Sequence, residues 1–421
     1  MNILFVFEAS NLETNGTTAT CNRFAHELRK KGHAVRILGV PHPLKNPDHY
    51  FGLKPFHFPF FQGLIEKEGF CFAKLDYEVM LKAVKWADVV HLFLPFKLSN
   101  VARILAEAEG KSVTSAYHLQ PQNVTSALHL GYSKCINNAL YAGFRDYLFV
   151  HTRHVHCPSE MIANQLRKHK HVNNVTHVIS NGVIPFFHRV ESKKPEEYKG
   201  KFVVTMSGRL AKEKRQDLII KAIATSKYNK DIQVVLCGKG PLEKRYRRLA
   251  HKLGLANPIQ IHFCNQDELR DILCYSDVYV HASDFEIEGI SAIEAITCGA
   301  VPVISDSELS ATSDFSLDDE HCVFKRGSYK DLRAKIECLY EDKALREELS
   351  RKYEESAPQF ALEAQVERLE KMFEIALEET KEKKDIPNTI YCKADRRRAK
   401  KIYSKLLKKG VVSELPKYCL E

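Results

Sequence analysis

The sequence predicts an α/β protein with two doubly wound domains facing a cleft, followed by a helical C-terminal segment. Apolar runs of strand length alternate with amphipathic helical stretches, which is typical of parallel sheets covered by helices. The alternation begins again after a polar stretch at residues 187–200, which we interpret as a linker. A chain of 421 residues that is 44% apolar and 28% charged is long enough for two or three such domains.

The first domain is expected over residues 1–186. Strands are predicted at 3–7, 34–40, 89–94 and 112–117, and helices at 17–31, at 100–109 and from Glu160. The aromatic-rich insertion at 49–62 fits neither the helix period nor the strand period. Two interpretations are open for this insertion, a buried loop and a lipid-contacting segment.

The second domain is expected over residues 201–358. Its predicted strands are 202–207, 233–237, 259–263, 278–281 and 301–304, and helices begin near 216, 242, 266 and 291. Neither domain carries a Gly-x-Gly-x-x-Gly fingerprint or a Walker phosphate loop. This absence argues against a dehydrogenase or a nucleotide triphosphatase.

Composition indicates a cytoplasmic location. The opening residues suit a first strand better than a signal peptide, and no run reaches the ~18 apolar residues of a membrane span. The 12 cysteines include no Cys-x-x-Cys pair, so we expect reduced thiols. We therefore expect no disulfide framework. We also expect no cofactor.

Charge is distributed unevenly along the chain. Residues 1–190 carry 21 basic and 13 acidic side chains, residues 191–380 carry 29 and 35, and residues 381–421 carry 13 and 5. A basic first part and a basic tail suggest an anionic partner. Because no zinc-finger, RNA-binding or helix-turn-helix pattern accompanies this charge, we expect an anionic membrane surface and no nucleic acid.

Two carboxylates eight residues apart flank a predicted helix start. Gly289 and Ser291 predict the start of this helix, with Glu286 in the loop before it and Glu294 about one turn inside. A helix N-terminus attracts phosphate, and carboxylates accept hydrogen bonds from hydroxyls. The pair therefore suits a sugar nucleotide, although Glu294 alone is equally compatible with a simple complement to the helix dipole.

The start of the second domain adds a glycine and two cations. Gly208 follows a predicted strand, at the sheet edge where ligands bind in such folds. Arg209 and Lys214 follow it and can bind phosphate oxygens. Each cation alone would be an ordinary surface residue, but together with the two carboxylates they favour a binding site.

Several motifs in this order resemble one family. They are Cys157-Pro-Ser, Val178-Ile-Ser-Asn181-Gly182-Val, Ser207-Gly-Arg209-Leu with Glu213-Lys214, Leu236-Cys-Gly238-Lys-Gly240-Pro241, Glu286-x7-Glu294-Ala and Gly299-x-Val-Pro-Val. Over roughly residues 1–380 the chain resembles the GT-B retaining glycosyltransferases of family 4, also called glycosyl transferases group 1. It departs from them at Ile287-Glu288, where a glycine and an aromatic residue are common, and at Gly16, where two glycines usually occur.

The resemblance implies roles for individual residues. Arg209 and Lys214 would bind the diphosphate of a nucleotide sugar, Glu286 the transferred sugar and Glu294 the ribose. The remaining donor-binding positions implied are Gly16, Gly208, Gly238, Gly289, Ile290 and Ser291. No metal is expected, because the cations would replace it; we interpret the acidic run at 318–320 as a solvated loop.

The acceptor side is predicted in the first domain. The polar run after the strand at 112–117 contains His118, Gln120 and Asn123. The resemblance implies that His118 contacts the donor sugar, and we expect Gln120 and Asn123 to bind the acceptor. His118 is also compatible with a structural role at the loop. The nearby His151, His154 and His156 lack the spacing of a metal site.

The C-terminal part extends beyond the family. Residues 359–380 are expected to form the helix that crosses back to the first domain, and residues 381–421 a basic tail. Within the tail, 394–410 predicts a basic helix with Ile402, Tyr403, Leu406 and Leu407 on one side. This pattern is compatible with binding at a membrane surface and with packing on the protein itself.

These observations predict a metal-independent retaining glycosyltransferase that is cytoplasmic and peripherally attached to the membrane. It would move a hexose from a nucleoside diphosphate sugar, with UDP-glucose as default, to a lipid or glycan hydroxyl. The run from His118 also resembles that of diacylglycerol glucosyltransferases, more weakly, so a membrane lipid is the expected acceptor. Three alternatives remain: a transferase of surface polysaccharide synthesis, a GT-B sugar-nucleotide epimerase, and a non-catalytic sugar-nucleotide-binding scaffold.

Overall fold

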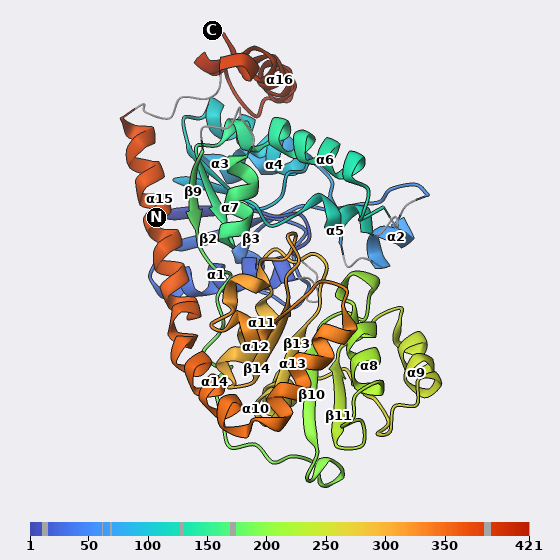
Figure 1. Ribbon diagram of the computed structural model, residues 1–421. Coiled ribbons are helices and arrows are strands. Elements are labelled where there is room, and N and C mark those ends of the chain that lie inside the picture. The colour runs from blue at the N-terminus through green and yellow to red at the C-terminus, as the bar shows by residue number, and fades with distance from the viewer. Residues whose placement is uncertain are drawn as a thin grey trace. The chain divides into compact units, whose positions relative to one another are not determined.

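The chain forms two compact units in a computed structural model that describes residues 1–10, 16–60, 62–67, 70–126, 130–168, 174–382 and 389–420 (Figure 1). The first unit comprises Met1–Ser180 with Gln365–Glu421, and the second comprises Asn181–Ala364. Residues 187–200, predicted as a linker, lie within the second unit, where Phe187 and Tyr198 are buried.

The first unit is built on a parallel sheet of seven strands in the order β3-β2-β1-β6-β7-β8-β9. A two-stranded antiparallel ribbon, β4-β5, follows β3 in the chain, with helix α2 (Gln62–Lys67) between its two strands. The strands are β1 (Asn2–Val6), β2 (Ala34–Gly39), β3 (Tyr50–Gly52), β4 (Pro55–Phe56), β5 (Phe72–Ala73), β6 (Val89–Leu92), β7 (Ser112–Ala116), β8 (His154–Cys157) and β9 (Val175–Val178).

Helices connect these strands, as a parallel sheet requires. They are α1 (Gly16–Lys30), α2 (Gln62–Lys67), α3 (Tyr77–Trp86), α4 (Lys97–Ala108), α5 (Pro121–Thr125), α6 (Lys134–Tyr147) and α7 (Glu160–Arg167), with short 3-10 helices at Pro47–His49 and Phe149–His151. The long helix α15 (Leu362–Lys381) returns to this unit as predicted. Its Phe373 ring lies 6.5 Å from that of Phe5 on β1, and its Glu370 accepts a hydrogen bond from His33.

The second unit has a parallel sheet in the order β12-β11-β10-β13-β14-β15. Its strands are β10 (Phe202–Ser207), β11 (Ile232–Cys237), β12 (Gln260–His262), β13 (Val278–His281), β14 (Val301–Ser305) and β15 (Val323–Phe324). Its helices are α8 (Gln216–Ala224), α9 (Glu243–Lys252), α10 (Gln266–Tyr275), α11 (Ile290–Thr297), α12 (Asp319–Cys322), α13 (Tyr329–Glu341) and α14 (Lys343–Ser356), with 3-10 helices η4 (Glu196–Tyr198), η5 (Lys212–Lys214), η6 (Ala311–Phe315) and η7 (Ala357–Phe360).

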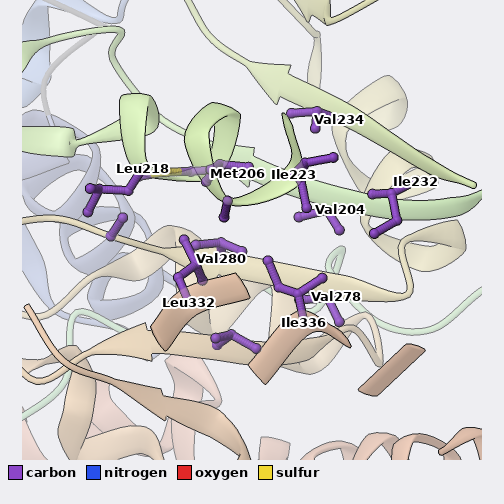
Figure 2. Packing of buried hydrophobic residues seen from close by; sticks show 14 of the residues in the cluster. Val204, Met206, Leu218, Ile223, Ile232, Val234, Val278, Val280, Leu332 and Ile336 are labelled. Carbon is purple, nitrogen blue, oxygen red and sulfur yellow. The ribbon is translucent and has the colours of Figure 1, made fainter. Parts of the chain in front are cut away.

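One face of this second sheet forms a buried apolar core (Figure 2). Alternate strand residues such as Val204, Val234 and Val280 point into it, and α8 and α13 close it with Leu218 and Ile336. The opposite face packs Tyr279 against α11. Because the core fixes the strands, it also fixes where their carboxyl ends present the loops of the site.

Two sequence interpretations are corrected by the fold. The insertion at 49–62 is not wholly irregular: Tyr50–Gly52 forms an edge strand, and Tyr50 and Phe51 are buried. Phe60 in the same insertion is fully exposed. The acidic run at 318–320 is not a loop, because Asp318 caps α12 by accepting a hydrogen bond from the His321 N–H.

The basic tail forms helix α16 (Thr389–Lys408), followed by a 3-10 helix at Lys417–Cys419. Ile402, Tyr403 and Leu406 are buried, so of the two interpretations of this apolar side, packing within the first unit is the one observed; Leu407 of the predicted set is exposed. The fully buried Arg103 of α4 pairs with Asp395 of α16 at 2.9 Å. None of the described helices is long and apolar enough to cross a membrane.

Candidate active site

The candidate donor site lies where the strand order of the second sheet reverses. Strands β10 and β13 are neighbours at this point, although β11 and β12 lie between them in sequence. In open parallel sheets, ligands bind beyond the carboxyl ends of the strands at such a switch point. Gly208, Arg209 and Lys214 follow β10, and Glu286 and Gly289 follow β13, so the fold brings these predicted residues to one edge.

Two glycines allow the loops after β10 and β11 to touch. A Cβ atom on Gly238 would lie 2.0 Å from the carbonyl oxygen of Gly208, and one on Gly240 would lie 2.3 Å from that of Leu210. The Gly208 N–H donates to the carbonyl of Cys237 at 2.8 Å. These glycines thus shape the floor of the site through close backbone packing, a role that the sequence motif alone did not specify.

Lys214 and Glu286 form a direct ion pair across the site. Lys214 ends the 3-10 helix η5, and the Asp284 N–H donates to the Glu213 carbonyl at 2.8 Å, which ties the two loops together. Burial alone would raise the pKa of Glu286, but the charge of Lys214 and the nearby His281 outweigh burial and lower this pKa to about 2. Glu286 is therefore a fixed carboxylate at every ordinary pH.

Two backbone hydrogen bonds fix the position of Glu286. Its N–H donates to the Leu309 carbonyl at 3.0 Å, and its carbonyl accepts from the Ala311 N–H at 2.9 Å. Gly289 has a φ of 97°, and a Cβ there would lie 2.2 Å from Cγ2 of Thr312. Only glycine fits this turn without displacing its neighbours, and the turn sets the direction of α11.

The start of α11 faces the same edge. Ser291, in the first turn, accepts a hydrogen bond from the hydroxyl of Tyr279 at 3.0 Å. Ile290 is the first helical residue and Glu294 is buried one turn further on. Sequence reasoning did not identify Tyr279, although a tyrosine within the apolar run 278–281 was a signal that a buried hydroxyl needs a partner.

The departure at Glu288 has a structural explanation. The Glu288 carboxylate is buried and accepts hydrogen bonds from the backbone N–H of Asn181 at 2.9 Å and from its Nδ2 at 2.5 Å. These bonds lie within the second unit, next to the point where the chain enters it. Glu288 therefore anchors the loop at Asn181, where an aromatic side chain could make no such bonds.

His118, Gln120, Asn123 and Gly16 belong to the first unit. His118 and Gln120 are buried after β7, and within the described part of the chain Nε2 of His118 and Oε1 of Gln120 have no hydrogen-bond partner. Such unpaired buried atoms are uncommon and mark groups that a ligand can satisfy. Burial holds the pKa of His118 well below its usual range, so its ring is neutral.

The other two predicted residues of this unit have helical positions. Asn123 is exposed and accepts a hydrogen bond from the Gln120 N–H at 3.0 Å, which stabilises the start of α5. Gly16 is the first residue of α1, and the loop before it lies outside the described residues. His154 bonds to His177 and Glu379, whereas His156 bonds to the Ile179 carbonyl. No group of three or more metal-ligating side chains occurs among the residues described.

Two family models match the chain in succession. Residues 14–185 match the model described as Glycosyltransferase Family 4, and residues 188–358 match the one described as Glycosyl transferases group 1. The phosphatidylinositol N-acetylglucosaminyltransferase GPI3 subunit of Saccharomyces cerevisiae is 26% identical over 135 residues. That match spans 30% of this chain and 30% of the yeast protein, less than a third of each.

Solved structures agree on the fold. HepE of Anabaena, in complex with UDP and glucose, matches with a TM-score of 0.65 and 16% identity over 89% of this chain and 99% of its own. Sucrose-phosphate synthase of Thermosynechococcus elongatus matches with a TM-score of 0.68 and 16% identity, covering 89% of this chain and 98% of its own. With the two parallel sheets and both family models, the chain belongs to the group 1, family 4 glycosyltransferases and has the GT-B fold.

Proposed function

We propose that this glycosyltransferase moves a hexose from a nucleoside diphosphate sugar to the hydroxyl of a membrane lipid, with retention of configuration at the sugar. The observation that carries the donor assignment is the Lys214–Glu286 pair at the strand-order reversal, beside the start of α11. A cation and helix N–H groups suit the diphosphate, and the adjacent carboxylate suits sugar hydroxyls. A nucleotide sugar carries a diphosphate and, next to it, sugar hydroxyls.

In the proposed reaction, the bond from the sugar carbon to the diphosphate breaks and a bond to the acceptor oxygen forms on the same face. Negative charge grows on the departing diphosphate, and the positive charges of Lys214 and Arg209 would stabilise it. Glu286, with a pKa lowered to about 2 by Lys214 and His281 against the opposing effect of burial, is too weak a base to take the acceptor proton. That proton passes instead to the released diphosphate, since phosphate oxygens titrate near pH 6.

The proposal of a lipid acceptor rests on charge and on one relative. Helix α16 exposes Arg397, Lys400, Lys401 and Lys408, and its apolar side is packed within the first unit. Attachment to an anionic leaflet would therefore be electrostatic, at about 1 kcal/mol for each cation near the surface. The yeast relative is named for action on phosphatidylinositol, which is itself a membrane lipid.

A donor-by-acceptor screen with mass detection of products tests the activity. We expect hexose transfer from UDP-glucose to a lipid hydroxyl such as that of diacylglycerol. Release of UDP and a rearranged free sugar without acceptor would instead identify an epimerase, and a water-soluble glycan product a polysaccharide transferase. Nucleotide-sugar binding without any turnover would identify a scaffold.

Site variants test the assignment of residues. Glu286→Ala and Lys214→Ala should each remove most transfer and leave the far-UV circular dichroism unchanged, because both side chains lie at the surface of the site and not in the core. Lys244→Ala, on the exposed side of α9, is the matched control and should keep full activity. Wild-type turnover by either site variant would refute the assignment.

Vesicle sedimentation tests membrane attachment. Deleting the tail helix would expose the surface of the first unit on which it packs, so neutralising its charges is the cleaner change. Replacing Arg397, Lys400, Lys401 and Lys408 together with glutamine should remove about 4 kcal/mol of attraction to anionic vesicles, since each cation contributes about 1. Binding equal to that of the unaltered protein would exclude α16 as the attachment surface.

A further inference from the structure

A buried histidine lies directly beneath the predicted sugar-binding carboxylate. His281 is the last residue of β13 and its side chain is fully buried. Its Nε2 lies 3.5 Å from Oε2 of Glu286, and its Cε1 would lie 3.6 Å from a Cβ on Gly289. Neither ring nitrogen makes a hydrogen bond to any residue that the structure describes. A buried polar ring without a hydrogen bond therefore lies against the Glu286 carboxylate.

The two oxygens of Glu286 have different surroundings. Oε2 is shared by Lys214 and His281. Oε1 makes no hydrogen bond to the described residues, and about a fifth of the side chain (21%) is exposed. The shared contacts therefore hold one oxygen of the carboxylate and leave the other available to a ligand.

The protonation state of the His281 ring allows it to donate one hydrogen bond. Burial lowers the pKa of His281, although contact with Glu286 acts in the opposite direction. At neutral pH the ring is uncharged and carries one N–H, which Nε2 can direct to Glu286. An uncharged donor orients the carboxylate without competing for the phosphate charges of a donor substrate.

We propose that His281 is a positioning residue that holds Glu286 with Oε1 directed at a hydroxyl of the transferred sugar. This inference rests on the proposed function, since it assigns His281 to the sugar part of the same donor site. Lys214 cannot hold Glu286 alone during the reaction, because its ammonium must also meet the diphosphate. His281 is anchored in a strand of the sheet and remains in place when Lys214 moves.

The proposed role of His281 affects binding of the sugar part of the ligand and not binding of the diphosphate. Loss of the His281 N–H frees Glu286 to rotate, which weakens binding of a sugar hydroxyl and leaves the diphosphate contacts intact. A nucleoside diphosphate without sugar offers no hydroxyl to Oε1 of Glu286. UDP-glucose and UDP therefore form a matched pair of probes.

Isothermal titration calorimetry of the full-length protein with both probes tests this. His281→Leu should weaken binding of UDP-glucose at least fivefold and change that of UDP by less than twofold. His281→Gln, whose Nε2 can occupy the place of the histidine Nε2, should restore UDP-glucose binding to within twofold. His281→Ala is measured in parallel so that a folding defect in one apolar variant leaves another, and His251→Leu, on the outer helix α9, is the control.

The outcomes are distinct. Unchanged UDP-glucose binding by the apolar variants overturns the inference, as does an equal loss for both probes that glutamine does not restore, because a purely structural histidine would act that way. Wild-type protein that binds neither UDP nor UDP-glucose overturns the proposed donor and the inference with it. Wild-type binding of both probes, with selective loss in His281→Leu and recovery in His281→Gln, supports it.

Discussion

Replacing Glu288 with alanine should destabilise the second unit by about 3 kcal/mol. The carboxylate is buried and accepts hydrogen bonds from two donors of Asn181: the backbone N–H, at 2.9 Å and 3.2 Å from its two oxygens, and Nδ2 at 2.5 Å. Bonds to a charged acceptor contribute about 1.5–3 kcal/mol each, and both donors would be left unpaired in a buried place. Removing a buried charge recovers part of that cost, so the lower part of the summed range applies.

Urea unfolding followed by far-UV circular dichroism is the appropriate measurement. The single tryptophan, Trp86, lies in the first unit, so its fluorescence does not report on the change. With a urea dependence of about 1–3 kcal/mol per molar, the midpoint of the second unit should fall by about 1–3 M. Glu288→Gln, which keeps one acceptor oxygen, should lose less. A midpoint equal to that of the unaltered protein would refute the assigned role of this carboxylate.

Three further predictions concern the site and the tail. Gly289→Ala should weaken UDP-glucose binding more than tenfold in calorimetry, because the φ of 97° and the 2.2 Å approach to Thr312 force the turn before α11 to move; equal affinity would contradict this. Glu286 is ordinarily expected to titrate at 4.5 and has a folded pKa of about 2, so it stabilises the fold above pH 4.5 and loses this effect as pH falls towards 2. Relative to Glu286→Gln, the advantage of the unaltered protein should thus shrink by about 3 kcal/mol over that window in urea titrations, and a constant difference would contradict it. Removing residues 389–421 uncovers α3 and α4, so Trp86 fluorescence should show unfolding of the first unit at lower urea concentration, and an unchanged transition would show that the tail adds no stability.

The second domain was the easier part of the fold to predict. Its central strands are continuous apolar runs, and 202–207 and 278–281 were placed at their observed ends. Strand β9 was missed because Val175–Val178 alternates with polar residues and is not fully buried, and β15 because it has only two residues. The edge strand at Tyr50–Gly52 was hidden in a run of aromatic residues that obeys no period.

Sequence reasoning could group candidate site residues that follow one another in a motif, but it could not find partners that the fold brings together. The motif placed Lys214 and Glu286 at one site, and the structure pairs them. Glu288 and Asn181 are 107 residues apart, and no local spacing connects them. His281 ends an apolar strand, so its role depends on a loop that returns over it.

The ion pair between Lys214 and Glu286 has a consequence for turnover. In the empty site the two opposite charges compensate each other, so a ligand that binds there must break this ion pair. A ligand that carries only phosphate pairs with the Lys214 ammonium and leaves the Glu286 carboxylate without a counter-charge. A ligand that carries phosphate and hydroxyls also donates hydrogen bonds to that carboxylate. After transfer the sugar has left the site, and re-formation of the ion pair favours release of the nucleoside diphosphate. The same contact therefore contributes both to selection of the substrate and to release of the product.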